Sequence, residues 1–334
     1  MSVDFWKFIR RRLAASEHLF LAHVAHHTRH SPGTTGARLA VSEEGTTHGT
    51  IGGGIMEAEV LSLAKEALKS RVFTPRHERL YHRKKAPDDQ RSRRSGLHCA
   101  GVQTNIYHLL SPDADRQKVD TIIERLDEDR PGLIHISEDG LAFEDHSPKA
   151  LEAPHQFEGG DTWRFSSQLL NWKRLAIIGG GHCGLALSRV MNQLGYTVTV
   201  VENRPHVFTF SENDHATHRI AVDDYAEAGS KIDYPSWTHV VVMTANQPDD
   251  VRGLYGVAQG SFPYIGVMGA PAKLAQIRAD LQELGIPTAL FDRFYAPIGL
   301  DMTSNTPEEI AISIAAEILQ ERQRLFPFTR SPRN

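Results

Sequence analysis

The chain has 334 residues, 40% of them hydrophobic, and a formal net charge of −4. This length accommodates two domains with a core each, and the small net charge gives no general attraction to nucleic acid or to a membrane surface. Only two cysteines occur, Cys99 and Cys183, which excludes a disulfide framework and favours a reducing compartment. Neither a signal peptide nor an apolar run of membrane-spanning length is evident. We therefore expect a cytoplasmic protein without nucleic-acid partners or stable membrane insertion.

The first part of the chain, residues 1–145, predicts an α+β domain. Residues 3–15 have the spacing of a short amphipathic helix. Compact apolar runs predict strands in 20–25, 37–41, 105–110 and 132–136.

A glycine loop, Gly49-Thr-Ile-Gly-Gly-Gly54, leads into a helical pattern in this first domain. The backbone N–H groups of Gly52, Gly53 and Gly54 are a candidate seat for a phosphate or a pterin, because the start of a helix attracts anions. Glu57 then lies in the first helical turn, in reach of the ligand or acting as a general base. The alternative is a tight turn in which Glu57 complements the helix dipole.

Cys99 lies in the loop Gly96-Leu-His-Cys-Ala-Gly101, just before a strand. A thiol in such a loop is a candidate metal ligand or persulfide carrier, since the thiolate is the reactive form. The alternative is a small buried hydrophobic residue. Residues 69–94 carry ten Lys or Arg. This segment is a candidate to bind phosphate or an acidic partner surface, and the alternative is a solvated loop.

The second part of the chain predicts a Rossmann-like, doubly wound parallel sheet over residues 173–326. Pro and Gly residues without sustained periodicity predict a linker at 146–172, and residues 327–334 are expected to fray. Near-continuous apolar runs predict buried strands, at 175–178, 198–201, 239–243 and 264–268.

The loop after the first of these strands has the dinucleotide-binding pattern Gly179-x-Gly181-x-x-Gly184. Glu202 ends the next strand, where an acid commonly binds a ribose hydroxyl. A third loop, Gly266-Val-Met-Gly269, is followed by Lys273 at a helix start. Lys273 either neutralises a ligand phosphate there or belongs to an ordinary turn.

Taken together, these motifs resemble the XdhC/CoxI family, whose members are accessory factors for xanthine dehydrogenase and related molybdenum hydroxylases. The resemblance covers about residues 15–325. It rests on the following residues and motifs: Pro32-Gly33, Gly36-Ala-Arg38, Gly49 to Gly54 with Glu57, Cys99-Ala-Gly101, Ile178 to Gly184, Glu202 with Arg204, Tyr264 to Gly269 with Lys273, Ala296-Pro-Ile-Gly-Leu-Asp301, and Thr306-Pro-Glu-Glu-Ile-Ala311.

The resemblance implies a chaperone for the molybdenum cofactor (molybdopterin with its metal) rather than a turnover enzyme. It implies binding of the cofactor, support of its sulfuration and delivery to a hydroxylase. The implied partners are a cysteine desulfurase, the hydroxylase and a second copy of the chain in a homodimer. Cys99 is then the ligand facing molybdenum and, with Glu57, the reactive group. The cofactor-binding residues that the resemblance implies are Arg38, Gly52, Gly53, Gly54, Gly179, Gly181, Gly184, Glu202, Arg204, Gly269, Lys273 and Asp301.

The chain departs from the family pattern at three places. Cys99 stands alone where the family often has two adjacent cysteines. Thr244-Ala245 replaces a common Thr-His pair, and Ala270-Pro-Ala-Lys273 replaces Ser-Arg-Arg-Lys. Two other functions therefore stay open. One is an NAD(P)-dependent oxidoreductase that uses Glu202 on the ribose, and the other is a nucleotide-sensing scaffold that docks the hydroxylase without chemistry.

Overall fold

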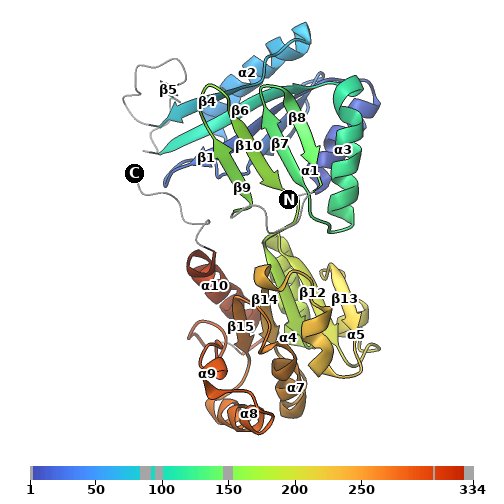
Figure 1. Cartoon of the computed structure of the whole chain (residues 1–334), viewed down its shortest axis with the longest axis vertical. Coiled ribbons are helices and arrows are strands. Elements are labelled where there is room, and N and C mark those ends of the chain that lie inside the picture. Colours follow the sequence, from blue (N-terminus) through green and yellow to red (C-terminus); the bar gives the residue numbers. More distant parts are fainter. Residues whose placement is uncertain (1–2, 83–91, 95–100, 146–152, 304, 327–334) are drawn as a thin grey trace. The chain divides into compact units, whose positions relative to one another are not determined.

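The computed structural model describes residues 3–82, 92–94, 101–145, 153–303 and 305–326 (Figure 1). Its contacts divide the chain into two compact units, residues 1–170 and residues 171–329. Within the described ranges, no helix is both long and apolar enough to cross a membrane. Each unit has its own sheet system and its own buried core.

A six-stranded sheet forms the centre of the first unit. Its strands are antiparallel except for the last pair. In spatial order they are β3 (Thr47–Thr50), β2 (Arg38–Ser42), β1 (Leu19–His27), β6 (Val102–Leu110), β4 (Arg76–Tyr81) and β5 (Ser92–Arg94). The apolar runs at the centre of β1 and β6 form the buried middle of the sheet, as the sequence predicted.

A second, four-stranded antiparallel sheet belongs to the same unit. Its order is β8 (Gly140–Glu144), β7 (Leu133–Ser137), β10 (Arg164–Gln168) and β9 (His155–Glu158). The expected linker at 146–172 therefore contains two strands of the folded unit, while residues 146–152 lie outside the described part. Since β9 and β10 are short and rich in polar residues, they have no periodicity that the sequence could reveal.

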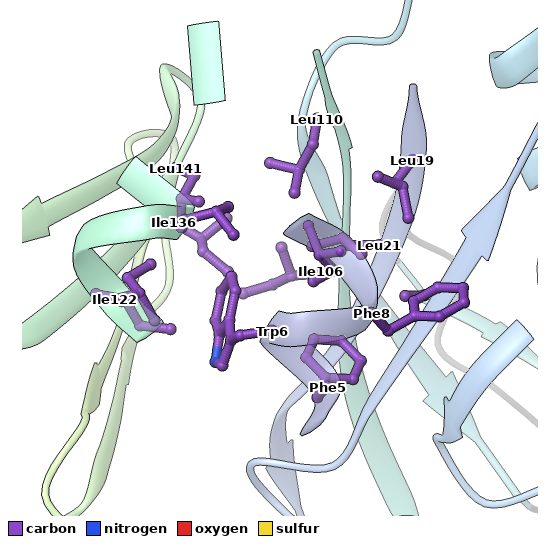
Figure 2. Close-up of a cluster of buried hydrophobic side chains, with 14 of the residues drawn as sticks. Phe5, Trp6, Phe8, Leu19, Leu21, Ile106, Leu110, Ile122, Ile136 and Leu141 are labelled. Carbon is purple, nitrogen blue, oxygen red and sulfur yellow. The ribbon is translucent and has the colours of Figure 1, made fainter. Parts of the chain in front are cut away.

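The main core of the first unit lies on one face of the large sheet. It combines residues of α1 (Val3–Ala14), α3 (Pro112–Asp127) and both sheets, and Trp6 is completely buried within it (Figure 2). Helix α2 (Gly54–Ser70) covers the opposite face through Met56, Val60 and Leu68. The sheet is thus buried on both sides, and the glycine loop before α2 belongs to the face opposite α1.

The second unit is the Rossmann-like domain, with a parallel sheet in the order β13-β12-β11-β14-β15 (Figure 1). The strands are β11 (Arg174–Ile178), β12 (Thr197–Glu202), β13 (His218–Ala221), β14 (Thr238–Val242) and β15 (Tyr264–Val267). The sequence predicted four of them. It missed β13, because this edge strand alternates between half-buried and exposed residues and has no apolar run.

Helices and short 3-10 turns connect and cover these strands. They are α4 (His182–Gln193), α5 (Phe208–Ser211), η1 (Tyr225–Glu227), α6 (Ala228–Lys231), η2 (Pro235–Trp237), α7 (Gln247–Val257), α8 (Pro271–Glu283), α9 (Thr288–Phe291) and α10 (Pro307–Leu325). Helix α10 begins with the predicted capping box, in which Thr306 and Glu309 satisfy each other's backbone N–H groups.

The strand order places a topological switch between β11 and β14. The chain runs from β11 outward through β12 and β13, then returns to the other side of β11 as β14. Ligands of open parallel sheets bind outside the carboxyl ends of the strands at such a switch point. The loops after β11, β14 and β15 therefore define the region to search for a site.

Three histidines, the buried His23 and His108 and the half-buried His155, make the stability of the first unit depend on pH. The His23 and His108 Nε2 atoms lie 3.2 Å apart, and His155 Nδ1 bonds the Ser167 hydroxyl at 2.8 Å. Burial lowers the pKa of His108 and of His155 to about 3, and that of His23 well below its usual value. At these histidines the unfolded chain binds protons that the folded chain does not bind. The free energy of unfolding is therefore highest above pH 6.5, and it falls as the pH drops below this value.

We expect the free energy of unfolding to fall between pH 7.5 and pH 5, by about 2 kcal/mol for His108 and by about as much for His155. Urea unfolding at the two pH values measures the change. His108→Gln should remove one such increment, whereas substitution of the exposed His206 by Gln should leave the pH dependence as it is. A pH dependence that His108→Gln does not reduce would contradict the assignment.

Candidate functional site

The glycine loop after β11 lets β11, β14 and α4 approach closely. Gly179 has a φ of +114°, and a Cβ there would meet the Met243 carbonyl oxygen at 2.4 Å. A Cβ on Gly184 would meet the Gly179 carbonyl oxygen at 2.4 Å. Both glycines are therefore required for packing, whether or not a ligand binds.

Gly181 differs from these two glycines, because a Cβ there would meet no described atom within 4 Å. It is also the N-cap of α4, and no side chain caps the helix at this point. The first turn of α4 thus presents N–H groups beside open space, which is the arrangement that accepts a phosphate. The structure thus leaves this part of the predicted cofactor site accessible.

Glu202 is buried beneath the glycine loop and bonded to it. Its Oε2 accepts a hydrogen bond from the Gly180 N–H at 2.6 Å, and its Oε1 accepts from Arg204 Nε at 2.8 Å. Burial opposes ionisation, but the hydrogen bonds from Arg204 and Gly180 outweigh it and hold the pKa of Glu202 below its usual value. A carboxylate this well satisfied is a structural anchor for the loop.

This geometry does not favour the expected contact between Glu202 and a ribose. The side chain has no exposed surface, whereas 39% of the Arg204 side chain is exposed. A ribose hydroxyl would have to displace Arg204 or the Gly180 N–H from the carboxylate. Arg204, rather than Glu202, is the group that a ligand at this end of the loop would touch.

Lys273 is held by a buried carboxylate in a similar way. Its Nζ lies 2.5 Å from Oδ2 of Asp250, a residue with no exposed surface. Oδ1 of Asp250 accepts hydrogen bonds from the N–H and the hydroxyl of Thr244, at 2.9 and 2.7 Å. This network joins the loop after β14 to α7 and α8, so the charge expected to neutralise a phosphate is already paired. The sequence does not reveal this role of Asp250, because its place in the first turn of a helix suggests only a complement to the helix dipole.

Gly269 and Asp301 line one hollow of about 640 Å³ at the carboxyl end of β15. The loop after β15, residues 297–302 and the first half of α10 form its walls. The structure thus brings together two predicted residues that are 32 positions apart. Asp301 is exposed at this hollow.

In the first unit, Glu57 occupies the glycine loop that was expected to hold an anion. Its Oε1 accepts hydrogen bonds from the Ile51 N–H at 2.8 Å, the Gly53 N–H at 2.9 Å and the Thr50 hydroxyl at 2.5 Å. Despite the opposing effect of burial, these bonds hold the pKa of Glu57 below its usual value. A lowered pKa makes Glu57 a weaker base, so the geometry supports the structural alternative more than general-base catalysis.

Gly52 and Gly54 complete this loop with positive φ angles of 125° and 66°. Arg38 lies elsewhere: its guanidinium packs over the rings of Phe5 and Trp6, at 5.0 and 5.9 Å from their centroids. These rings belong to α1, on the sheet face opposite α2. Arg38 therefore does not join Glu57 in a common site.

Cys99 lies outside the described residues, and so does most of the basic segment after Tyr81. The other cysteine, Cys183, is half-buried in the first turn of α4 and packs against an apolar cluster. Burial and the nearby Glu308 raise the pKa of the Cys183 thiol. Within the described part of the chain, no three His, Cys, Asp or Glu side chains converge as a metal site would require.

The two kinds of glycine in the loop after β11 predict different effects of the same substitution. Gly179→Ala should lower the free energy of unfolding by about 1–3 kcal/mol, because the new Cβ collides with backbone. Gly181→Ala should change it by less than about 0.5 kcal/mol, since the space is open. Denaturant unfolding of both variants measures the difference, and equal losses would refute the distinction.

Glu57 should contribute to stability through the backbone it caps. We expect Glu57→Ala to lower the free energy of unfolding by about 1–2 kcal/mol, as removal of a helix cap does. Glu57→Gln, which retains an oxygen acceptor, should cost less. Glu66→Ala on the exposed surface of the same helix is the matched control, and thermal unfolding gives the comparison. A loss for Glu57→Ala no larger than for Glu66→Ala would exclude the capping role.

Each of the two units contains a segment that matches a known protein family. Residues 12–78 match the model of the XdhC and CoxI family, and residues 175–318 match that of the XdhC Rossmann domain. The chain is 28% identical over 151 residues to the uncharacterized protein YqeB of Escherichia coli, which is 44% of this chain and 27% of YqeB. It is 27% identical over 152 residues to a probable xanthine dehydrogenase subunit of Bacillus subtilis, which is 46% of this chain and 44% of that protein.

The chain thus matches less than half the length of each of these curated relatives. A crystal structure from Bacillus halodurans, described as a xanthine dehydrogenase, has the same fold. It aligns with a TM-score of 0.69 and 23% identity over 97% of this chain and 96% of that one. Because family models match a segment in each unit, this chain belongs to the XdhC/CoxI family.

Proposed function

We propose that this protein is an accessory factor that binds the molybdenum cofactor, supports its sulfuration and delivers it to a molybdenum hydroxylase of the xanthine dehydrogenase type. Membership of the XdhC/CoxI family supports this role, as does the similarity to a probable xanthine dehydrogenase subunit of Bacillus subtilis. The partners in this proposal are the hydroxylase, a cysteine desulfurase that supplies the sulfur, and a second copy of the chain.

The observation that carries the proposal is the open seat at Gly181. The cofactor is an organic anion whose phosphate requires hydrogen-bond donors and positive potential. The uncapped start of α4 offers both, next to space that no described atom fills. Cys99 would provide a thiolate, a soft ligand suited to a molybdenum centre. In this proposal the cofactor is cargo, held and passed on.

An NAD(P)-dependent oxidoreductase has weaker support from the same region. In such an enzyme Glu202 would bind a ribose hydroxyl. The carboxylate of Glu202 is, however, buried and hydrogen-bonded to Gly180 and Arg204. A nucleotide-sensing scaffold would use the same seat at Gly181. Native mass spectrometry of freshly purified protein separates these functions, because it weighs any retained small molecule and counts the protomers.

We expect Cys99→Ala to abolish activation of the apo-hydroxylase by sulfurated cofactor, while the fold is retained. Cys183→Ala is the matched control, since its thiol packs among apolar side chains and should be dispensable. Hydroxylase turnover after incubation with each variant, together with circular dichroism, measures both effects. Full activation by Cys99→Ala would refute the role of this thiol.

Gly181→Val should release the cofactor, because its side chain fills the space that a phosphate would enter. The measurement is the molybdenum and phosphate content of the purified variant against the wild type. An unchanged content would exclude the α4 start as the binding seat.

A further inference from the structure

The hollow beside Asp301 has the size and lining of a small-molecule site. Its volume of about 640 Å³ is within the range of roughly 300–1,000 Å³ typical of ligand pockets. Most of its lining side chains are apolar, and the carboxylate of Asp301 is the one charged group among them. The lining residues are Met268, Gly269, Ala270, Pro297, Ile298, Gly299, Leu300, Asp301, Met302, Ile310, Ser313 and Ile314.

The wall that carries Asp301 is fixed by α10. Gly299 has a φ of +98°, and a Cβ there would meet the Ser313 hydroxyl at 2.5 Å. The same hydroxyl donates to the Leu300 carbonyl at 2.8 Å, and the Gly299 N–H donates to Glu317 Oε2 at 3.1 Å. The loop is therefore held in place before any ligand arrives.

The other side of this loop is fixed by the sheet. The Ile298 N–H donates to the Val267 carbonyl of β15 at 3.1 Å, and Tyr295 forms a parallel bridge with Gly266. The segment thus covers the free edge of β15 while it forms the wall of the hollow. A site supported from both sides is preorganised, which lowers the entropic cost of binding.

Asp301 gives the hollow its chemical preference. The side chain is exposed, and its carboxylate has no hydrogen bond or ion pair with any described residue. A free carboxylate repels an anion and accepts N–H donors, two of them when the donors lie side by side. The apolar side chains of Met268, Ile298 and Ile314 suit the faces of a planar ring.

We propose that this hollow binds a planar heterocycle through a 2-amino-4-oxopyrimidine edge, with Asp301 accepting from the ring N3–H and the 2-amino group. The class of ligand is a pterin, an assignment that rests on the proposed function. Guanine has the same edge, so it is the competing source of this chemistry. The hollow also reaches Ala270 at the uncapped start of α8, where an acidic substituent on the ring is favoured.

The test compares two free bicyclic rings that differ at one position. Pterin has an amino group at C2, and lumazine has a carbonyl oxygen that would face the Asp301 carboxylate. Isothermal titration of the full chain with each ring gives the affinities. We expect pterin to bind at least about 10-fold more tightly than lumazine, the discrimination typical of one good bidentate contact.

Two variants and a control locate the binding. Asp301→Asn should weaken pterin binding by at least about 10-fold and remove the preference over lumazine. Ile310→Trp should block both rings by filling the hollow. Glu283→Gln, an exposed carboxylate at the end of α8, should bind as the wild type does. Circular dichroism and thermal unfolding verify that each variant is folded.

Three results would overturn the inference: equal affinity for pterin and lumazine, unchanged pterin binding by folded Asp301→Asn, or tighter binding of guanosine than of pterin. Failure of this inference can be told apart from failure of the proposed function. A protein that retains molybdenum cofactor and activates the hydroxylase, but whose binding is indifferent to Asp301→Asn and Ile310→Trp, keeps the function and loses this site.

Discussion

The architecture of the second unit depends on the close approach of Gly179 to the backbone at Met243 and Thr244. No side chain fits there, since a Cβ would lie 2.4 Å from the Met243 carbonyl oxygen. This contact brings the end of β11 against the end of β14 and directs the chain into α4. The open space at Gly181 exists because the neighbouring glycines allow the turn to close. The candidate anion seat is thus a consequence of backbone packing.

Several charged residues that suggest ligand binding in the sequence instead hold loops in place. Glu57 binds the amides of the loop before α2, Glu202 binds the loop before α4, and Asp250 holds Lys273. Each of these carboxylates is satisfied by partners from this chain, so a ligand gains little by replacing them. Among the described residues, the predicted groups that stay accessible to a ligand are the start of α4 at Gly181, the exposed part of Arg204 and the carboxylate of Asp301. This contrast separates residues that shape the site from residues that can contact a cargo.

The family membership and the geometry of the second unit support one another. In the proposed role, the protein binds its cargo and then releases it to a partner. An open seat of backbone amides at Gly181 and a preformed hollow with one exposed carboxylate suit that task better than an enclosed catalytic site would. The proposal therefore assigns recognition to a few backbone donors and one acidic side chain. The thiol of Cys99, which lies outside the described residues, supplies the contact with the metal in this proposal.

The sequence alone determined the fold class, four of the five parallel strands and the capping box of α10, because these features follow from local apolar runs and glycine spacing. It missed β3, β4, β5, β8, β9, β10 and β13, which are short or polar strands that pairing with neighbouring strands stabilises. It identified Gly181 and Asp301 as candidate binding residues, but it could not tell them from Glu57, Glu202 and Lys273. Only the tertiary structure decided that difference, since whether a charge is free or already paired depends on contacts with residues that the sequence does not place beside it.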